Sequence, residues 1–134
     1  MPVSKLLDTN ICIYIARNRP PSVARRFARA APGSLAISII TWGELCFGAA
    51  KSVDPARVQS LLEAFAREVG VLEMPVSAGP HYGELRAALQ KSGTPIGNND
   101  LWIAAHALAL GVPLVSNNTR EFARVPGLKL ENWI

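Results

Sequence analysis

The sequence predicts a single α/β domain built on a parallel β-sheet, and two observations support this fold class. Short apolar runs alternate with longer helical stretches along the 134 residues. Most of these runs are also too far apart in the chain to pair as hairpins, so right-handed crossovers should join them into one parallel sheet. The length suits one domain with its own hydrophobic core, which we expect to span residues 1–134.

The first half of the chain is expected to contain three strands, at residues 3–7, 35–40 and 69–74. Pro20 and Pro21 end a first, buried helix near residue 18, and Pro32 with Gly33 ends a second, basic helix over residues 22–31. Thr41 resembles an N-cap, with Glu44 three residues later as in a capping box, ahead of a helix over residues 42–51. Asp54 followed by Pro55 predicts the start of another helix, which runs to about residue 68.

The second half alternates in the same way. A long amphipathic helix is expected over residues 77–91, followed by a loop at 92–99 that is rich in turn residues. Asp100 opens the next helix, and Gly111 ends it after Leu110. A fourth strand is predicted at residues 113–116, then a loop with one helical turn to residue 124, and a short edge strand at 128–130.

Composition limits the class of protein and of partner. Hydrophobic residues form 49% of the chain and charged residues 18%, with a mean hydropathy of +0.19, which excludes a disordered protein and predicts apolar surface covered by a partner. The net charge of +4 permits a nucleic-acid partner. Cys12 and Cys46 are expected to be reduced core thiols. With no secretory leader and no stretch near the ~20 apolar residues that a membrane helix needs, we expect a cytoplasmic protein without membrane contact.

The acidic residues stand at the ends of the predicted elements. Asp8 follows the first strand, Glu44 lies in the first turn after the second, and Asp100 begins a helix. Asn118 and Glu121 follow the fourth strand. Residues just past the carboxyl ends of parallel strands meet in one crevice, so Asp8, Glu44 and the loop after the fourth strand are expected to lie together. Asp100 joins them if its helix starts from the same edge, which the spacing alone does not establish. Each also has a local alternative, because Asp8 can cap a helix, Glu44 can complete a capping box, and Asp100 can oppose a helix dipole.

A crevice with several carboxylates favours a hard metal ion. Two carboxylates ~4 Å apart repel each other by ~4 kcal/mol at an effective dielectric constant of ~20, and a divalent cation would offset this repulsion. Oxygen ligands without Cys or His indicate Mg²⁺, or alternatively Mn²⁺, rather than zinc. His81 and His106 are interpreted as structural residues, and the chain contains no phosphate-binding loop, dinucleotide-binding glycine motif or serine nucleophile elbow.

Five segments, in order and spacing, resemble PIN-domain proteins of the VapC type, the toxins of bacterial type II toxin–antitoxin pairs. The segments are LLDTN at 6–10, IITWGEL at 39–45, GNNDLWIAAHA at 97–107, LVSNNTREF at 114–122 and VPGLKLENW at 125–133. The resemblance covers essentially the whole chain. It implies a three-layer α/β/α sandwich whose central parallel sheet has the strand order 3-2-1-4-5.

The resemblance also implies a metal-dependent ribonuclease. Asp8, Glu44 and Asp100 match the three acidic positions of the family, where they would bind Mg²⁺ and act in catalysis. The fourth position, often Asp in PIN domains, is Asn118 here, and Glu121 nearby is expected to compensate, through water. The hydroxyl positions near the site are matched by Thr9 and Ser116.

The implied reaction is hydrolysis of an RNA phosphodiester by a water that the metal activates, which leaves a 5′-phosphate and a 3′-hydroxyl. Preference for RNA must then come from shape and groove contacts. Five basic residues are candidates for phosphate contacts. They are Arg17, Arg25, Arg26, Lys91 and Arg120.

The implied partners are a cognate antitoxin and a second copy of the chain. The first two helices are expected to leave a groove that receives the C-terminal segment of an antitoxin, with acidic residues facing Arg25, Arg26 and Arg29. A second apolar face is expected to form a homodimer.

Other functions remain open from the residues alone. An aspartate-nucleophile phosphatase or phospho-acceptor domain would explain Asp8, but the phosphatase pattern needs a second Asp where this chain has Asn10. A PIN-like module that only binds is favoured by Asn118, and a PIN nuclease outside toxin–antitoxin systems would use the same site on other nucleic acids.

Overall fold

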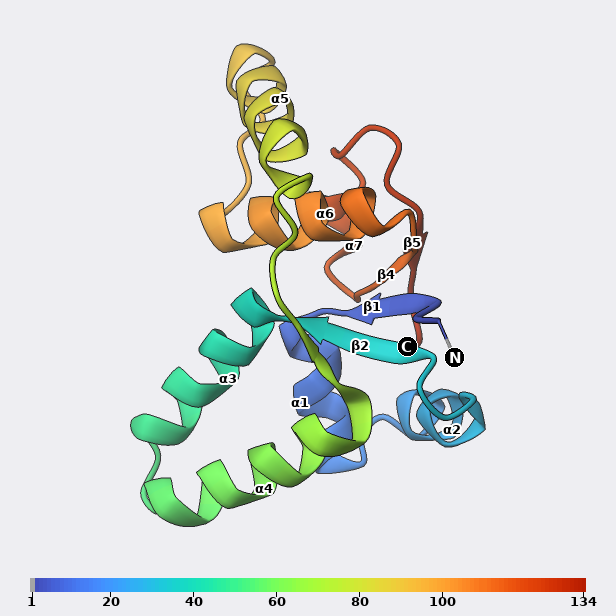
Figure 1. The fold of residues 1–134 in the computed structure, drawn as a ribbon, viewed down its shortest axis with the longest axis vertical. Coiled ribbons are helices and arrows are strands. Elements are labelled where there is room, and N and C mark those ends of the chain that lie inside the picture. Colours follow the sequence, from blue (N-terminus) through green and yellow to red (C-terminus); the bar gives the residue numbers. More distant parts are fainter. Residues whose placement is uncertain (1) are drawn as a thin grey trace.

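A computed structural model describes residues 2–134 and shows one five-stranded, wholly parallel sheet in the order β3-β2-β1-β4-β5 (Figure 1). The strands are β1 (Lys5–Leu7), β2 (Leu35–Ser38), β3 (Val71–Leu72), β4 (Leu114–Val115) and β5 (Leu130–Glu131). In the central register, Leu7 lies between Ile37 and Val115. The parallel sheet and its order confirm both the predicted fold class and the topology implied by the resemblance.

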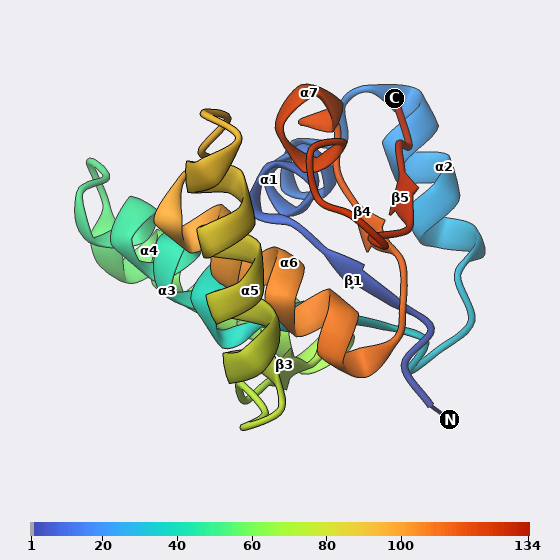
Figure 2. The ribbon, with the colours of Figure 1, turned by 90° about the horizontal axis from the view of Figure 1, so that it is seen from above.

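Among residues 2–134, seven helices cover the two faces of the sheet. They are α1 (Thr9–Arg17), α2 (Pro21–Arg29), α3 (Ile39–Ala50), α4 (Pro55–Val69), α5 (Ala78–Lys91), α6 (Asn98–Leu110) and α7 (Thr119–Phe122). Figures 1 and 2 show α5, α6 and α7 on one side of the sheet and α1 to α4 on the other. The sheet is therefore the middle layer and the two groups of helices are the outer layers, as in the expected three-layer sandwich.

Two hydrophobic cores, one on each face, follow from the alternation of side chains along β1. Leu6 is fully buried on the α5–α6 side, where it packs with Leu114 and Phe122. Leu7 is fully buried on the opposite side with Ile11. A buried parallel strand reads as a continuous apolar run because both of its faces are covered, which is why the sequence of β1 was recognisable.

The start of α3 differs from the prediction. Strand β2 ends at Ser38, whose hydroxyl accepts a hydrogen bond from the backbone N–H of Ile40 at 3.1 Å and caps the helix. The predicted capping box at Thr41 and Glu44 is therefore wrong, because Thr41 is already inside the helix and fully buried. The fully buried His106 lies 2.8 Å from the Ser38 hydroxyl through Nδ1, which agrees with a structural histidine.

The other helix ends agree more closely. Asp54 caps α4, with its carboxylate accepting from the N–H of Arg57 at 3.3 Å, and Gly111 ends α6 with a φ of +70°, a conformation that suits glycine. Helix α6 begins at Asn98 rather than Asp100, so Asp100 lies inside its first turn.

Both cysteines are unpaired; Cys12 is buried, but Cys46 is only half-buried, so its expected place in the core is wrong. Within the described residues, every helix is too short or too polar to cross a bilayer.

Candidate active site

Asp8 lies at the carboxyl end of β1 and is 5% exposed. One carboxylate oxygen caps α1 by accepting from the N–H of Ile11 at 2.9 Å, and the other accepts from the hydroxyl of Ser116 after β4. Burial raises the pKa of Asp8, while the bonds from Ser116 and Ile11 oppose that rise. Asp8 thus caps α1, which confirms its local alternative, and its second carboxylate oxygen faces the segment after the neighbouring strand β4.

Glu44 is held between two other elements of the crevice. The Thr9 hydroxyl at the start of α1 donates to Glu44 Oε1 at 2.5 Å, and the Asn99 amide at the start of α6 donates to Oε2 at 3.4 Å. Because Glu44 lies in the second turn of α3, its carboxylate points toward these elements instead of folding back on its own helix end. Asn99 was missed from the sequence, where it read as one of several turn residues.

Asp100 and Glu121 are neighbouring acids whose pKa values shift in opposite directions. Burial, a hydrogen bond with Glu121 and the nearby charges of Glu121, Glu44 and Asp8 raise the pKa of Asp100 to about 7. Burial also acts to raise the pKa of Glu121, but hydrogen bonds from Asp100 and Asn118 outweigh it and lower that pKa. The two shifts have opposite directions, so the protonated form is favoured at Asp100 and the ionised form at Glu121.

Asn118 faces Glu121. Its side-chain amide donates to Glu121 Oε2 at 2.6 Å, and its backbone N–H donates to the Ser116 hydroxyl at 2.9 Å. The expected site residues thus lie together at one end of the sheet, and we call this cluster the acidic crevice. Thr9, Ser116 and Asn118 contact the acids, and the four acids influence one another. Glu121 is a direct neighbour of Asp100, which the sequence spacing did not reveal.

Comparison with known proteins places this chain in a family. The family model for the PIN domain matches residues 5–128. The tRNA(fMet)-specific endonuclease VapC of Shigella flexneri is 44% identical over 128 residues, which cover 96% of each chain. The chain belongs to the VapC family of PIN-domain proteins. The ribonuclease VapC2 of Haemophilus influenzae is likewise 44% identical, over 96% of this PIN domain and 97% of the relative.

Solved structures agree with this assignment. The DNA-bound VapBC complex of Salmonella typhimurium contains a chain that superposes with a TM-score of 0.92 at 40% identity, covering 98% of this PIN domain and 99% of that chain. VapBC2 of Rickettsia felis, bound to a promoter DNA fragment, gives a TM-score of 0.88 at 39% identity, covering 100% of each chain.

The donor set of the PIN domain fits a hard divalent cation. All candidate ligands are carboxylate oxygens, and burial together with the neighbouring acids raises the pKa of Asp100 to about 7. Among residues 2–134, no three His, Cys, Asp or Glu side chains are already arranged to hold an ion. The acids are instead neighbours held by Ser116, Thr9 and Asn118, and a cation would have to compete with the proton on Asp100.

Two basic residues that were expected to face an antitoxin in the groove beside α2 line a different pocket. Arg26 on α2 forms an ion pair with Glu131, so it is not a free surface charge. Arg26 and Arg29 both line a pocket with Trp133, whereas the apolar groove on the other side of α2 is lined by Ala24 and Phe27. Arg25 lines neither pocket and is exposed.

Proposed function

We propose that this PIN domain is a Mg²⁺-dependent endoribonuclease that acts as the toxin of a type II toxin–antitoxin pair in the cytoplasm, with Mn²⁺ as an alternative ion. The observation that carries the proposal is the crevice of four interacting carboxylates in a chain 44% identical to a tRNA-specific endonuclease over nearly its full length. Asn118 does not argue for a module that only binds, because Glu121 supplies a fourth carboxylate beside it.

Asp8, Glu44 and Asp100 would hold the cation, and Glu121 would add to the negative charge around it. When bound, the ion supplies a Lewis acid that makes a water molecule more acidic and steadies charge on the phosphate. The protein positions the ligands: Ser116 and the N–H of Ile11 fix Asp8, and Thr9 and Asn99 fix Glu44. Asp100 would give up its proton to solvent when a cation binds, and ionised Glu121 would stay beside it as an added negative charge.

The substrate class is RNA, and we propose a tRNA because the relative in Shigella flexneri is named for one. Attack by water in line with the scissile bond leaves a 5′-phosphate and a 3′-hydroxyl, and it needs no 2′-hydroxyl. Selection of RNA therefore depends on contacts outside the acidic crevice.

The proposed partner is an antitoxin segment in the apolar groove between α1, α2 and α4. This groove has a volume of about 430 Å³ and is lined by Ile15, Phe27, Leu61 and Phe65. An amphipathic peptide would insert apolar side chains there and place acidic ones near Arg25. The related solved structures are VapBC complexes, which supports a protein partner. We also propose a homodimer, with exposed apolar side chains such as Phe47, at 65% exposure, in contact.

The activity is tested by incubating the purified chain with bulk tRNA in Mg²⁺, in EDTA and after the substitution Asp100→Asn. We expect cleavage in Mg²⁺ alone, with 5′-phosphate ends, and none in the other two samples. Cleavage that persists in EDTA, or equal activity of the variant, would contradict the proposed chemistry. RNA binding without any cleavage would instead favour a module that only binds.

The partner is tested by co-expression with the product of the adjacent upstream reading frame, followed by light scattering of the isolated chain and of the mixture. We expect a dimer for the isolated chain and a larger, inactive complex with the neighbour. A chain that stays monomeric, forms no complex and keeps its activity would exclude the toxin–antitoxin assignment but not the nuclease.

A further inference from the structure

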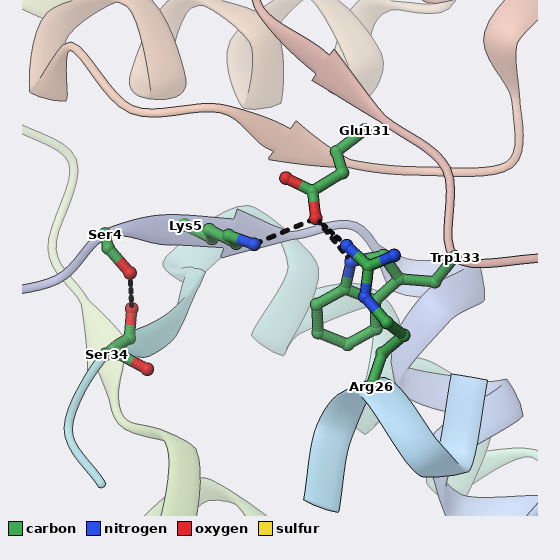
Figure 3. Close-up of polar contacts among 6 residues, drawn as sticks. All are labelled: Ser4, Lys5, Arg26, Ser34, Glu131 and Trp133. Carbon is green, nitrogen blue, oxygen red and sulfur yellow. Dashed lines mark hydrogen bonds and ion pairs between the residues drawn. The ribbon is translucent and has the colours of Figure 1, made fainter. Parts of the chain in front are cut away.

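A second charged pocket lies between α2 and the start of β1, away from the acidic crevice. Its volume is about 490 Å³. Three cationic side chains, two serines and an aromatic ring define it, and we name it the basic pocket: Lys5, Arg26, Arg29, Ser4, Ser34 and Trp133. Figure 3 shows Lys5, Arg26 and Trp133 converging on Glu131, while the Ser4 hydroxyl donates to the carbonyl of Ser34 at 3.2 Å.

One oxygen of Glu131 accepts the hydrogen bonds of Lys5, Arg26 and Trp133. Glu131 Oε1 accepts from Lys5 Nζ at 2.8 Å, from Trp133 Nε1 at 2.9 Å and from the guanidinium of Arg26 (Figure 3). Burial acts to raise the pKa of Glu131, but the bonds from Lys5 and Trp133 and the charges of Lys5 and Arg26 lower it overall. Glu131 is therefore ionised at neutral pH and supplies one negative charge.

The cations of the basic pocket outnumber this one acid. Lys5 and Arg26 both face the same carboxylate oxygen, so one positive charge remains unbalanced, and Arg29 on the same side of α2 adds another. Their side chains stay accessible, since 45% of Arg26 and 31% of Lys5 is exposed. Like charges this close repel each other, and an anion bound beside them would relieve the repulsion.

We infer that the basic pocket binds a phosphate group of the RNA backbone, at a distance from the cleavage site. The donors suit phosphate: guanidinium forks and an ammonium group contact phosphate oxygens, and serine hydroxyls add neutral donors. An acidic peptide fits less well because the apolar wall consists of small alanines and of Leu35 and Trp133, which are only 6% and 3% exposed, so a peptide anchor has little to insert against. The apolar groove on the other side of α2 has the lining that a peptide needs.

The position of the basic pocket suits a long substrate. Lys5 begins β1 and Asp8 follows its end, about 10 Å apart along the strand at a rise of ~3.3 Å per residue. Phosphates repeat along an RNA chain, so one molecule that places a phosphodiester at Asp8 carries others within reach of Lys5 and Arg29. This inference rests on the proposed function, because it takes RNA as the substrate.

The test measures RNA binding without cleavage. A fluorescent single-stranded RNA oligonucleotide is titrated in EDTA with the intact chain, with Arg29→Glu and with the matched control Arg67→Glu. Arg29 and Arg67 are both exposed and have no ion-pair partner among the described residues, and both substitutions change the net charge equally, but Arg67 lies on α4 outside the basic pocket.

We expect Arg29→Glu to weaken binding several-fold and to reduce the slope of log K against log salt by about 0.7, the value for one phosphate contact on a single strand. Arg67→Glu should leave the slope unchanged. Lys5→Gln is a second test variant, because Arg26 still neutralises Glu131 in it. This variant should also reduce the slope of log K against log salt.

Equal slopes for Arg29→Glu and Arg67→Glu would overturn the inference. So would a loss of binding to the upstream-encoded protein in Arg29→Glu with no change in RNA binding, which would make the pocket a protein interface. Since the titration contains EDTA, it does not depend on the proposed activity. If the chain cleaves no RNA but shows the slope change, the proposed nuclease activity is wrong and the phosphate site in the basic pocket stands.

Discussion

The acidic crevice and the basic pocket lie toward opposite ends of β1, and each gathers more charge of one sign than its neighbours balance. In the crevice, repulsion among the acids is relieved by a proton, which Asp100 retains up to a pH of about 7. In the basic pocket, Lys5 and Arg26 share one carboxylate oxygen and keep their charge. The difference is chemical: carboxylates can take up a proton near neutral pH, whereas guanidinium and ammonium groups do not lose theirs. The crevice is therefore suited to exchanging a proton for a cation, and the pocket to a permanent counter-ion.

The largest expected effect is on cleavage. Asp100→Asn or Asp8→Asn should lower the rate of RNA cleavage in Mg²⁺ more than about 100-fold, because even the loss of a residue that supports a metal ligand costs 10–100-fold. Both variants should remain folded, since Asn can replace Asp8 as the cap of α1. Circular dichroism and gel assays of cleavage measure this, and full activity of Asp100→Asn would remove that residue from the site.

The next effect concerns the pH dependence of cation binding. Mg²⁺ must displace the proton on Asp100, so its apparent affinity should rise with pH up to about 7 and then level off. Calorimetric titrations at neutral pH, in buffers of different ionisation enthalpy, should show release of protons on binding. Mg²⁺ binding that is independent of pH between 5 and about 7 would contradict the raised pKa of Asp100.

The same shift predicts how the stability of the metal-free chain depends on pH. The folded pKa of Asp100, about 7, lies above its ordinary value of 3.8, so between these values the folded state holds more protons than the unfolded state. Asp100 therefore favours folding less as pH rises through this window. Thermal unfolding should show that Asp100→Asn gains stability over the unchanged chain as pH rises from 4 to about 7, and a constant difference would count against the prediction.

A smaller effect is expected at the fourth position of the site. Asn118→Asp adds a charged oxygen to a hard-cation site and should tighten Mg²⁺ or Mn²⁺ binding. It also removes the amide that donates to Glu121, so the metal-free variant should unfold at a lower temperature. Calorimetry with and without metal separates the two effects, and weaker binding would show that Asn118 does not face the ion.

The smallest effect tests the pocket through its acid. Glu131→Gln removes the charge that Lys5 and Arg26 share and should lower the melting temperature by a few degrees, about what a loss near 1 kcal/mol gives in a domain of this size. The added net positive charge should strengthen RNA binding at low salt, an effect absent from Glu63→Gln on the exposed surface of α4. If Glu131→Gln leaves RNA binding unchanged, the basic pocket does not bind RNA.

Much of the fold followed from local patterns in the sequence. The apolar run at β1, the Asp54–Pro55 start of α4 and Gly111 after α6 each depend on neighbours a few residues away, and the structure confirms them. The placement of Asp8 and of the loop after the fourth strand at one end of the sheet followed too, because parallel strands bring their carboxyl ends together.

The tertiary structure decided the pairings. Three contacts join residues that no local pattern connects. They are the contact between Asp100 and Glu121, the Ser116 bond to Asp8 across 108 positions and the Arg26 bond to Glu131 across 105. Even the cap of α3 depended on packing, since the Ser38 hydroxyl also contacts His106, 68 positions away. Local sequence sets which backbone conformation each segment prefers, but a side chain's partner depends on which distant segment packs against it, and only the assembled sheet and its two helical layers determine that.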